Sequence, residues 1–160
     1  MATKSQVPPS DRISASFKEL AASAARLNSV SDELASAIRP IDAALKKLNL
    51  GVAAWHSYAG SEDSGGEFSN RRIGYARVGR KWGLALSTVS GNHNYGVEDE
   101  EEWLFNDAPR WMRIEAVDHL PDLLEILVKK ASKTAENLQK KAERARELAD
   151  SISAATEVRR

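Results

Sequence analysis

A long series of apolar and small residues near the amino terminus constrains the fold more than any other feature. Its members follow one another at alternating steps of four and three residues. They are Ile13, Phe17, Leu20, Ala24, Leu27, Ser31, Leu34, Ile38, Ile41, Leu45 and Leu48. This spacing places them on one stripe of an α-helix and is typical of a coiled-coil seam. The sequence therefore predicts a long helix whose stripe needs a partner.

The ends of this helix are marked by ordinary capping and stop signals. Ser10 or Asp11 can cap its start, and Asn49 and Gly51 favour a stop, so we expect the helix over residues 10–49. Pro40 removes one backbone donor and clashes with the preceding turn, which predicts a kink or a restart. The pattern alone leaves open whether Pro40 kinks or ends the helix.

The apolar period then changes, and residues 51–105 read as a small antiparallel sheet. Residues 51–60 suggest a first strand, and residues 72–78 and 81–90 suggest a hairpin that turns at Gly79 and Arg80. Residues 103–105 would add a short fourth strand. The segments between them, 61–70 and 91–102, are polar and predict loops, the second with five consecutive acidic residues at 98–102.

Two helices follow the predicted sheet. The stretch WLFNDAPRWMRIEAVDHLPDLLEIL, residues 103–127, carries the chain from the last strand into a short helix over 107–120 and then into a long helix over 121–155. Its two tryptophans are expected as core anchors. A second seam follows the long helix at Leu120, Leu124, Leu127, Ala131, Leu138, Ala145 and Ile152.

Together these elements predict an α+β fold. The two long helices are expected to form an antiparallel coiled-coil hairpin, because each stripe is too narrow to stand alone. The three- or four-stranded antiparallel sheet and the short helix would be inserted between them. Residues 10–155 would make a single domain, with a flexible tail at 1–9 and a frayed end at 156–160.

Composition excludes several classes of protein. The 160 residues hold 23 basic and 23 acidic side chains, so the whole chain does not advertise affinity for nucleic acid or membranes. The chain has no cysteine, which excludes disulfides and cysteine-based zinc sites. It shows no secretory signal and no apolar run long enough to cross a membrane. The expected location is the cytoplasm.

Catalytic and metal-binding motifs are missing from the sequence. His56, His93 and His119 show no ligand spacing such as HxxxH, so a metal site would have to be assembled from distant positions. No GxSxG elbow and no glycine-rich phosphate loop is present. We expect no enzyme, no cofactor and no metal. A weaker hypothesis is a small-ligand or enzymatic pocket under the sheet, lined by Trp55, His56 and Tyr75.

The leading functional hypothesis is a non-enzymatic module for self-association and protein binding. It depends on the seam, which holds more apolar residues than a two-helix ribbon buries, so a homodimer would cover more of it. Another protein is a possible partner as well. The interface candidates are Phe17, Leu20, Leu27, Leu34, Ile38 and Ile41.

The alternative is a nucleic-acid-binding accessory or regulatory protein that uses the hairpin 71–82. Basic residues among aromatic ones on a sheet can hold single strands by phosphate contacts and base stacking. The candidates are Arg71, Tyr75, Arg77, Arg80 and Lys81. Strand alternation divides this group between two faces, which favours an ordinary charged hairpin.

Overall fold

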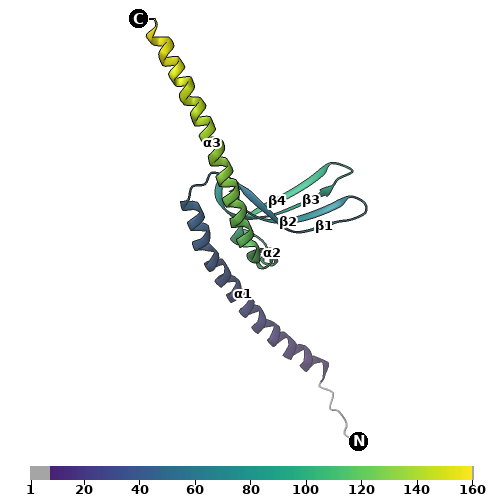
Figure 1. The fold of residues 1–160 in the computed structure, drawn as a ribbon. Coiled ribbons are helices and arrows are strands. Elements are labelled where there is room, and N and C mark those ends of the chain that lie inside the picture. Colours follow the sequence, from purple (N-terminus) through teal and green to yellow (C-terminus); the bar gives the residue numbers. More distant parts are fainter. Residues whose placement is uncertain (1–7, 160) are drawn as a thin grey trace. The chain divides into compact units, whose positions relative to one another are not determined.

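A computed structural model describes residues 8–159, with three helices, four strands and two short 3-10 turns along that range (Figure 1). The elements are α1 (Pro9–Lys47), β1 (Ala54–Glu62), β2 (Glu67–Val78), β3 (Lys81–Asn92), β4 (Val97–Leu104), η1 (Phe105–Asp107), α2 (Arg110–Ala116), η2 (Val117–His119) and α3 (Leu120–Glu157). The chain divides into two compact units, one ending at Ile41 and the other beginning at Asp42. Of the predicted tail, residues 1–7 lie outside the described part, as does Arg160 of the predicted frayed end.

Helix α1 is one continuous helix through Pro40, so the proline does not end it. The boundary between the two units falls directly after Ile41, the next residue. The helix stops where the sequence indicates: Asn49 and Gly51 both have positive φ, 49° and 62°, a backbone conformation that cannot continue a right-handed helix.

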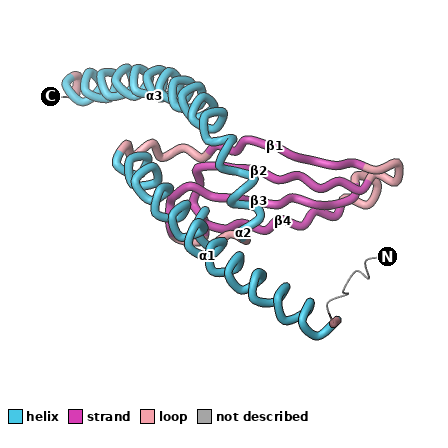
Figure 2. The backbone as a smooth tube through the Cα atoms, turned by 90° about the horizontal axis from the view of Figure 1, so that it is seen from below, coloured by secondary structure: helices cyan, strands magenta, loops and turns pink. Residues whose placement is uncertain are grey.

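The sheet has the strand order β1-β2-β3-β4, and every pair is antiparallel (Figure 2). Val78 pairs with Lys81 across the predicted turn, where Gly79 supplies a positive φ of 60°. The strands are longer than predicted, because Glu67 pairs with Asn92 and Val97 pairs with Asn92 from the other side. The two predicted polar loops were therefore largely wrong. Backbone hydrogen bonds hold this end of the sheet. Such pairing requires no alternation of apolar and polar residues, so the sequence carries no strand signal there.

The acidic run at 98–102 lies in β4 instead of a loop. Strand β4 is an edge strand of the sheet. An edge carries unpaired backbone groups that invite another chain to pair, and charged side chains discourage such pairing. The run is thus explained by its position at an edge.

The core of the second unit forms where α2 and α3 cover one face of the sheet. Tyr75 pairs with Leu84 and Ile73 with Leu86, and all four side chains are buried. The helices contribute Met112, Ala116, Leu120, Leu123 and Leu127, all buried. Strand alternation places these apolar side chains together on one face, and burying a leucine there stabilises the fold by about 1.5–3 kcal/mol.

The opposite face of the sheet carries Trp55 among small and polar residues. Trp55 lies across Gly74, where an added Cβ would come within 2.4 Å of the indole. The Arg72 guanidinium lies 4.8 Å above the Trp55 ring and donates to Ser87 and Glu100. Ser87 is completely buried beneath these side chains. A buried hydroxyl with a partner avoids a desolvation penalty.

A side chain from the last turns of α1 completes the edge of β3. Strand β4 ends at Leu104, opposite Ala85, so Leu84 has no strand partner on that side. Asp42 Oδ1 accepts the Leu84 backbone N–H at 2.7 Å, while Asp42 Oδ2 pairs with Lys46 Nζ at 2.6 Å. The carboxylate thus replaces the missing strand and satisfies a donor on a buried residue.

The predicted coiled-coil hairpin of two long helices was wrong. In α3 the buried leucines are Leu120, Leu123 and Leu127, while the predicted seam residue Leu124 is 41% exposed. Further along α3, Leu138, Leu148 and Ile152 are 66%, 62% and 61% exposed. The sheet covers the start of the helix, and a periodic stripe does not specify whether its partner is a helix or a sheet.

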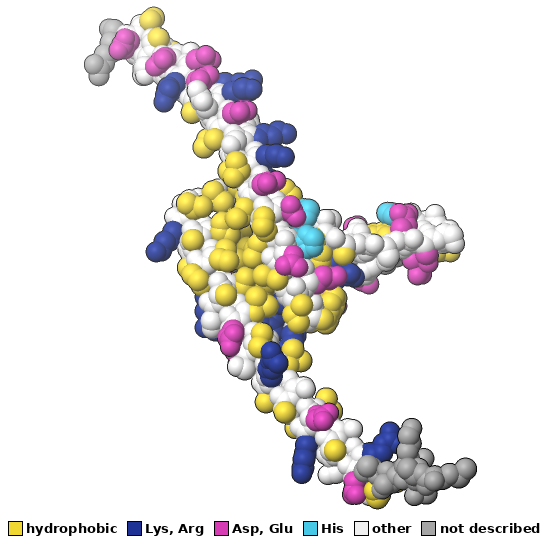
Figure 3. Space-filling model, turned by 60° about the horizontal axis from the view of Figure 1, so that its bottom comes forward, with side chains coloured by type: hydrophobic (Ala, Val, Ile, Leu, Met, Phe, Trp, Pro, Cys, Tyr) yellow, Lys and Arg dark blue, Asp and Glu magenta, His cyan; other side chains and the backbone are white. Residues whose placement is uncertain are grey.

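The first part of α1 also exposes its stripe. Ile13, Phe17 and Leu20 are 70%, 69% and 63% exposed, and every residue from Pro8 to Val30 is exposed. Further along, Ile38 and Leu45 are buried. Along both helices, apolar and charged side chains reach the surface together (Figure 3). Among the described residues, no helix is long and apolar enough to cross a membrane.

Candidate functional site

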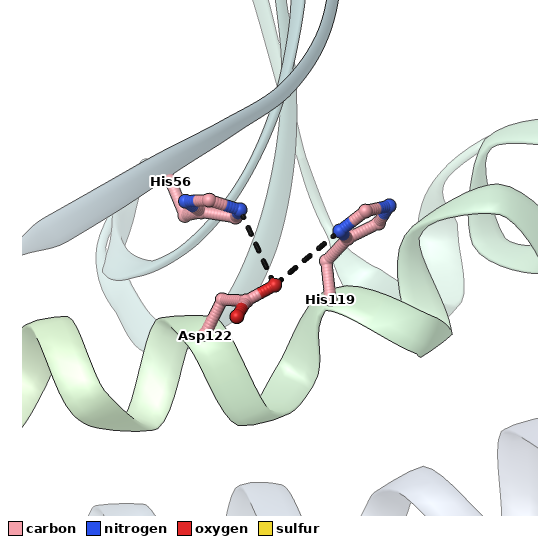
Figure 4. A group of neighbouring side chains, drawn as sticks. All are labelled: His56, His119 and Asp122. Atoms are coloured by element: carbon pink, nitrogen blue, oxygen red, sulfur yellow. Dashed lines mark ion pairs between the residues drawn. The ribbon is translucent and has the colours of Figure 1, made fainter.

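Two histidines and an aspartate meet where β1 passes the start of α3. The Oδ2 atom of Asp122 lies 3.6 Å from His56 Nε2 and 3.6 Å from His119 Nδ1. The three ligand-type atoms lie within 4.8 Å of one another. Figure 4 shows both imidazole rings directed toward the carboxylate. We call these three residues the His2Asp cluster.

Ordinary secondary structure brings the cluster together. His56 pairs with Ile73 across the sheet and therefore shares its helix-facing side. His119 ends η2, and Asp122 stands in the first turn of α3, so the two lie one helical turn apart. The register of β1 against β2 shifts between Ser57 and Ala59, directly beside His56. Such bulges redirect side chains and are common next to functional sites.

Neighbouring side chains hold the His119 ring in place. The ring of Tyr58 stacks on it at a centroid distance of 4.7 Å with an interplanar angle of 14°. Since Tyr58 is two residues after His56, both rings reach the same helix end from one strand. Burial raises the pKa of the Tyr58 hydroxyl, with the nearby Glu115 carboxylate adding to the effect and Arg71 opposing it. The phenol therefore stays neutral beside the imidazole.

An ion pair joins β2, the neighbour of β1 in the sheet, to α2. Arg71 donates through Nε and a terminal nitrogen to both Glu115 oxygens, at 2.7 and 2.8 Å. This hydrogen-bonded pairing raises the pKa of Arg71. The Arg71 guanidinium also lies 5.7 Å from the centroid of the Trp111 ring. A two-pronged arginine–carboxylate contact fixes the orientation of both partners and joins β2 to α2.

The His2Asp cluster is partly open to solvent. The side chains of His56, His119 and Asp122 are 25%, 32% and 54% exposed. At 3.6 Å, the carboxylate oxygen is farther from each imidazole nitrogen than the 2.7–3.2 Å of a hydrogen bond. The three groups thus converge without a hydrogen bond between the carboxylate and either ring.

The hairpin proposed for nucleic-acid binding does not present one continuous basic and aromatic surface. Arg71 is bound to Glu115, and Tyr75 is buried and stacked on Trp82 at 5.6 Å. The exposed basic residues of the group are Arg77, Arg80 and Lys81, which lie in or beside the turn of the hairpin. Phosphate contacts at that turn would therefore lack the base-stacking Tyr75.

The interface candidates divide along α1. Phe17, Leu20 and Leu27 are exposed, and Leu34 is half-buried. Ile38 is buried and Ile41 lies at the margin of exposure. The predicted seam is therefore exposed from Ile13 to Leu27 and alternates between buried and exposed residues further along.

The three residues expected to line a pocket do not lie together. Trp55 lies on the face opposite His56, over Gly74, and Tyr75 is packed in the core. The meeting of His56 with His119 was not predicted from the sequence. Two local signals point to it in retrospect: His56 and Tyr58 share one side of a strand, and His119 and Asp122 share one side of a helix start.

Comparison with known proteins returned no relative: no protein family, characterised protein or solved structure matches this chain.

Proposed function

We propose that this protein is a self-association module in which the apolar stripe of α1 pairs with the same stripe of a second copy. The observation that carries the proposal is the exposure of Ile13, Phe17, Leu20 and Leu27 at coiled-coil spacing. Most helical stability in proteins comes from packing an apolar face. An exposed stripe of this length therefore needs a cover, and exposed apolar surface of this kind marks interaction sites.

The residues beside the stripe favour a second copy as the cover. The positions that flank a coiled-coil seam usually carry the charges that select one partner over another. In α1 the flanking positions between the exposed seam residues hold uncharged side chains: Ser14, Ser16, Ala21 and Ser23. Lys18, Glu19 and Arg26 lie on the far side of the helix. Two identical stripes therefore meet without repulsion between like charges, in either orientation.

The net charge of the chain also favours a second copy as the partner of the stripe. Basic and acidic residues balance at 23 each, so two copies carry no net repulsion at neutral pH. Ala24 in the middle of the stripe is small enough for two helices to approach closely. Such pairing buries Ile13, Leu20 and Leu27, which recur every seven residues, and excludes water along the contact.

The test compares the mass of the protein in solution with that of a matched pair of variants. Leu20→Lys with Leu27→Lys puts two charges into the stripe. Ala22→Lys with Ser29→Lys adds the same charges at residues two positions further along, on the far side of α1. Light scattering across a dilution series is expected to give two or more copies for the native chain and the control, and one copy for the stripe variant.

A native chain that stays monomeric at every concentration contradicts the proposal. So does a stripe variant with the same mass as the native chain. A monomer that carries nucleic-acid absorbance, lost at high salt, would favour the basic hairpin turn of Arg77, Arg80 and Lys81 instead.

A further inference from the structure

We propose that His56, His119 and Asp122 form a binding site for one divalent transition-metal ion of the Zn²⁺ type. This site is independent of the stripe on α1, since it is built by β1, η2 and α3. Two imidazoles and a carboxylate are ligands that suit first-row metals such as zinc, copper and nickel. The spacing of the donor atoms, the held ring and the open side of the cluster all support it.

The spacing fits an ion between the three donors. A tetrahedral zinc ion has bonds of about 2.0–2.1 Å, which places its ligand atoms roughly 3.3 Å apart. Asp122 Oδ2 lies 3.6 Å from each imidazole nitrogen, and no two of the three atoms are farther apart than 4.8 Å. Small side-chain rotations bring them to the required geometry, without movement of the strand or helix.

The ring of His119 is already oriented for binding. Its stacking on Tyr58 fixes the plane, and its Nδ1 atom faces the carboxylate (Figure 4). A ligand held in its binding orientation loses less conformational freedom when the ion arrives. His56 comes from the strand beside the bulge, which leaves its Nε2 directed at the same oxygen.

Three protein ligands leave the fourth position of a tetrahedral ion for water. More than half of the Asp122 side chain is exposed, so solvent reaches this side of the cluster. The ion would join the edge strand β1 to the first turn of α3. An ion that binds the folded chain and not the unfolded chain raises the unfolding temperature.

The chain contains its own control in His93. This imidazole lies 3.6 Å from Glu62 Oε1 and stacks on Phe68 at 4.3 Å, so it has a carboxylate and an aromatic neighbour like His119. Among the described residues it belongs to no group of three potential metal ligands. A histidine–carboxylate pair alone binds zinc weakly, and the contrast isolates the contribution of the third ligand.

Calorimetric titration of Zn²⁺ into tag-free protein, cleared of metal with a chelator, tests the site. We expect one ion per chain, with affinity reduced at least tenfold in His56→Gln, His119→Gln and Asp122→Asn and unchanged in His93→Gln. Zinc should also raise the unfolding temperature of the native chain and of His93→Gln, but not of His119→Gln. Co²⁺ should give the visible absorption of a tetrahedral complex. Site variants that bind as tightly as the native chain, or a native chain that binds no zinc, would overturn the proposal.

A measurement on the native chain alone decides the case if a variant fails to fold. The ring signals of all three histidines can be followed by nuclear magnetic resonance as Zn²⁺ is added. The signals of His56 and His119 should shift together and saturate at one equivalent, while those of His93 stay in place. A shift of His93 first, or of no histidine, contradicts the assignment.

Discussion

The two halves of α3 have similar apolar spacing and opposite surroundings. Between Leu120 and Leu127 the helix lies on the sheet, and Leu123 is completely buried. From Ser132 to Glu157 every residue is exposed, including Leu138, Leu148 and Ile152. The first half needs no other chain, whereas the second half, like the start of α1, presents apolar residues to solvent. A periodic stripe therefore indicates that a helix requires a partner, while the rest of the fold determines whether the same chain provides it.

The largest effect on stability is expected from shortening a buried side chain in the part of α3 that the sheet covers. Leu123→Ala removes a fully buried side chain and leaves a cavity, which should lower the free energy of unfolding by about 2–5 kcal/mol. Leu148→Ala makes the same chemical change in the exposed half and should cost less than about 0.5 kcal/mol in dilute protein. Chemical denaturation measures both. Equal losses would mean that the exposed half is packed in solution.

The next effect concerns the carboxylate that replaces a strand at the edge of β3. Asp42→Ala leaves the Leu84 N–H without its acceptor and should cost about 1–3 kcal/mol. Asp42→Asn keeps an oxygen acceptor and should cost less, while it loses the ion pair with Lys46. The difference between the two variants in urea denaturation measures the hydrogen bond. Identical stabilities would show that the bond contributes little.

A smaller effect is expected at the ion pair between β2 and α2. Glu115→Ala removes the acceptor of two Arg71 hydrogen bonds, and we expect a loss of about 1 kcal/mol, since both side chains are about one-third exposed and solvent screens them. A double-mutant cycle with Arg71→Ala gives the coupling between the two residues. A coupling near zero would show that the pair does not help to hold α2 on β2.

The smallest effect should appear at the acidic edge strand. Burial raises the pKa of Glu102, Glu100 beside it adds to the rise, and Arg72 opposes it. A raised carboxyl pKa means that the fold favours the protonated form, so this contribution is present in acid and lost as pH rises through the folded pKa. Glu102→Gln should therefore stabilise the protein slightly at pH 7, by less than about 1 kcal/mol after discounting for solvent screening, and not at pH 3.

The control for this prediction is Glu101→Gln, which removes the same charge from the other face of β4. Thermal unfolding at both pH values gives the comparison. A gain at pH 3 as large as that at pH 7, or an equal gain in the control, would show that the effect does not come from the environment of Glu102.

The sequence predicted those parts of the structure that follow from local periodicity and turn chemistry. The long first helix and the hairpin with its turn at Gly79 both have local signals. The partner of each helix had no such signal, and the coiled-coil prediction failed because the sheet takes the place expected for α1. The extended polar strands were missed because backbone pairing, rather than burial, holds them.

The His2Asp cluster was beyond local patterns for a related reason. His56 and His119 meet only because β1 pairs with β2 and α3 crosses this end of the sheet. Residue spacing along the chain cannot show such a meeting. The sequence does contain two local pairs: His56 stands two residues before Tyr58, and His119 stands three residues before Asp122.

The most direct test of the central claim is hydrogen exchange of the native chain at high and at low protein concentration. If a second copy covers the α1 stripe, amides of residues 13–27 should exchange slowly in concentrated protein and quickly after dilution, whereas those of Ile73 and Leu86 should stay slow in both. Exchange in residues 13–27 that does not depend on concentration would contradict the claim that a second copy is the missing partner.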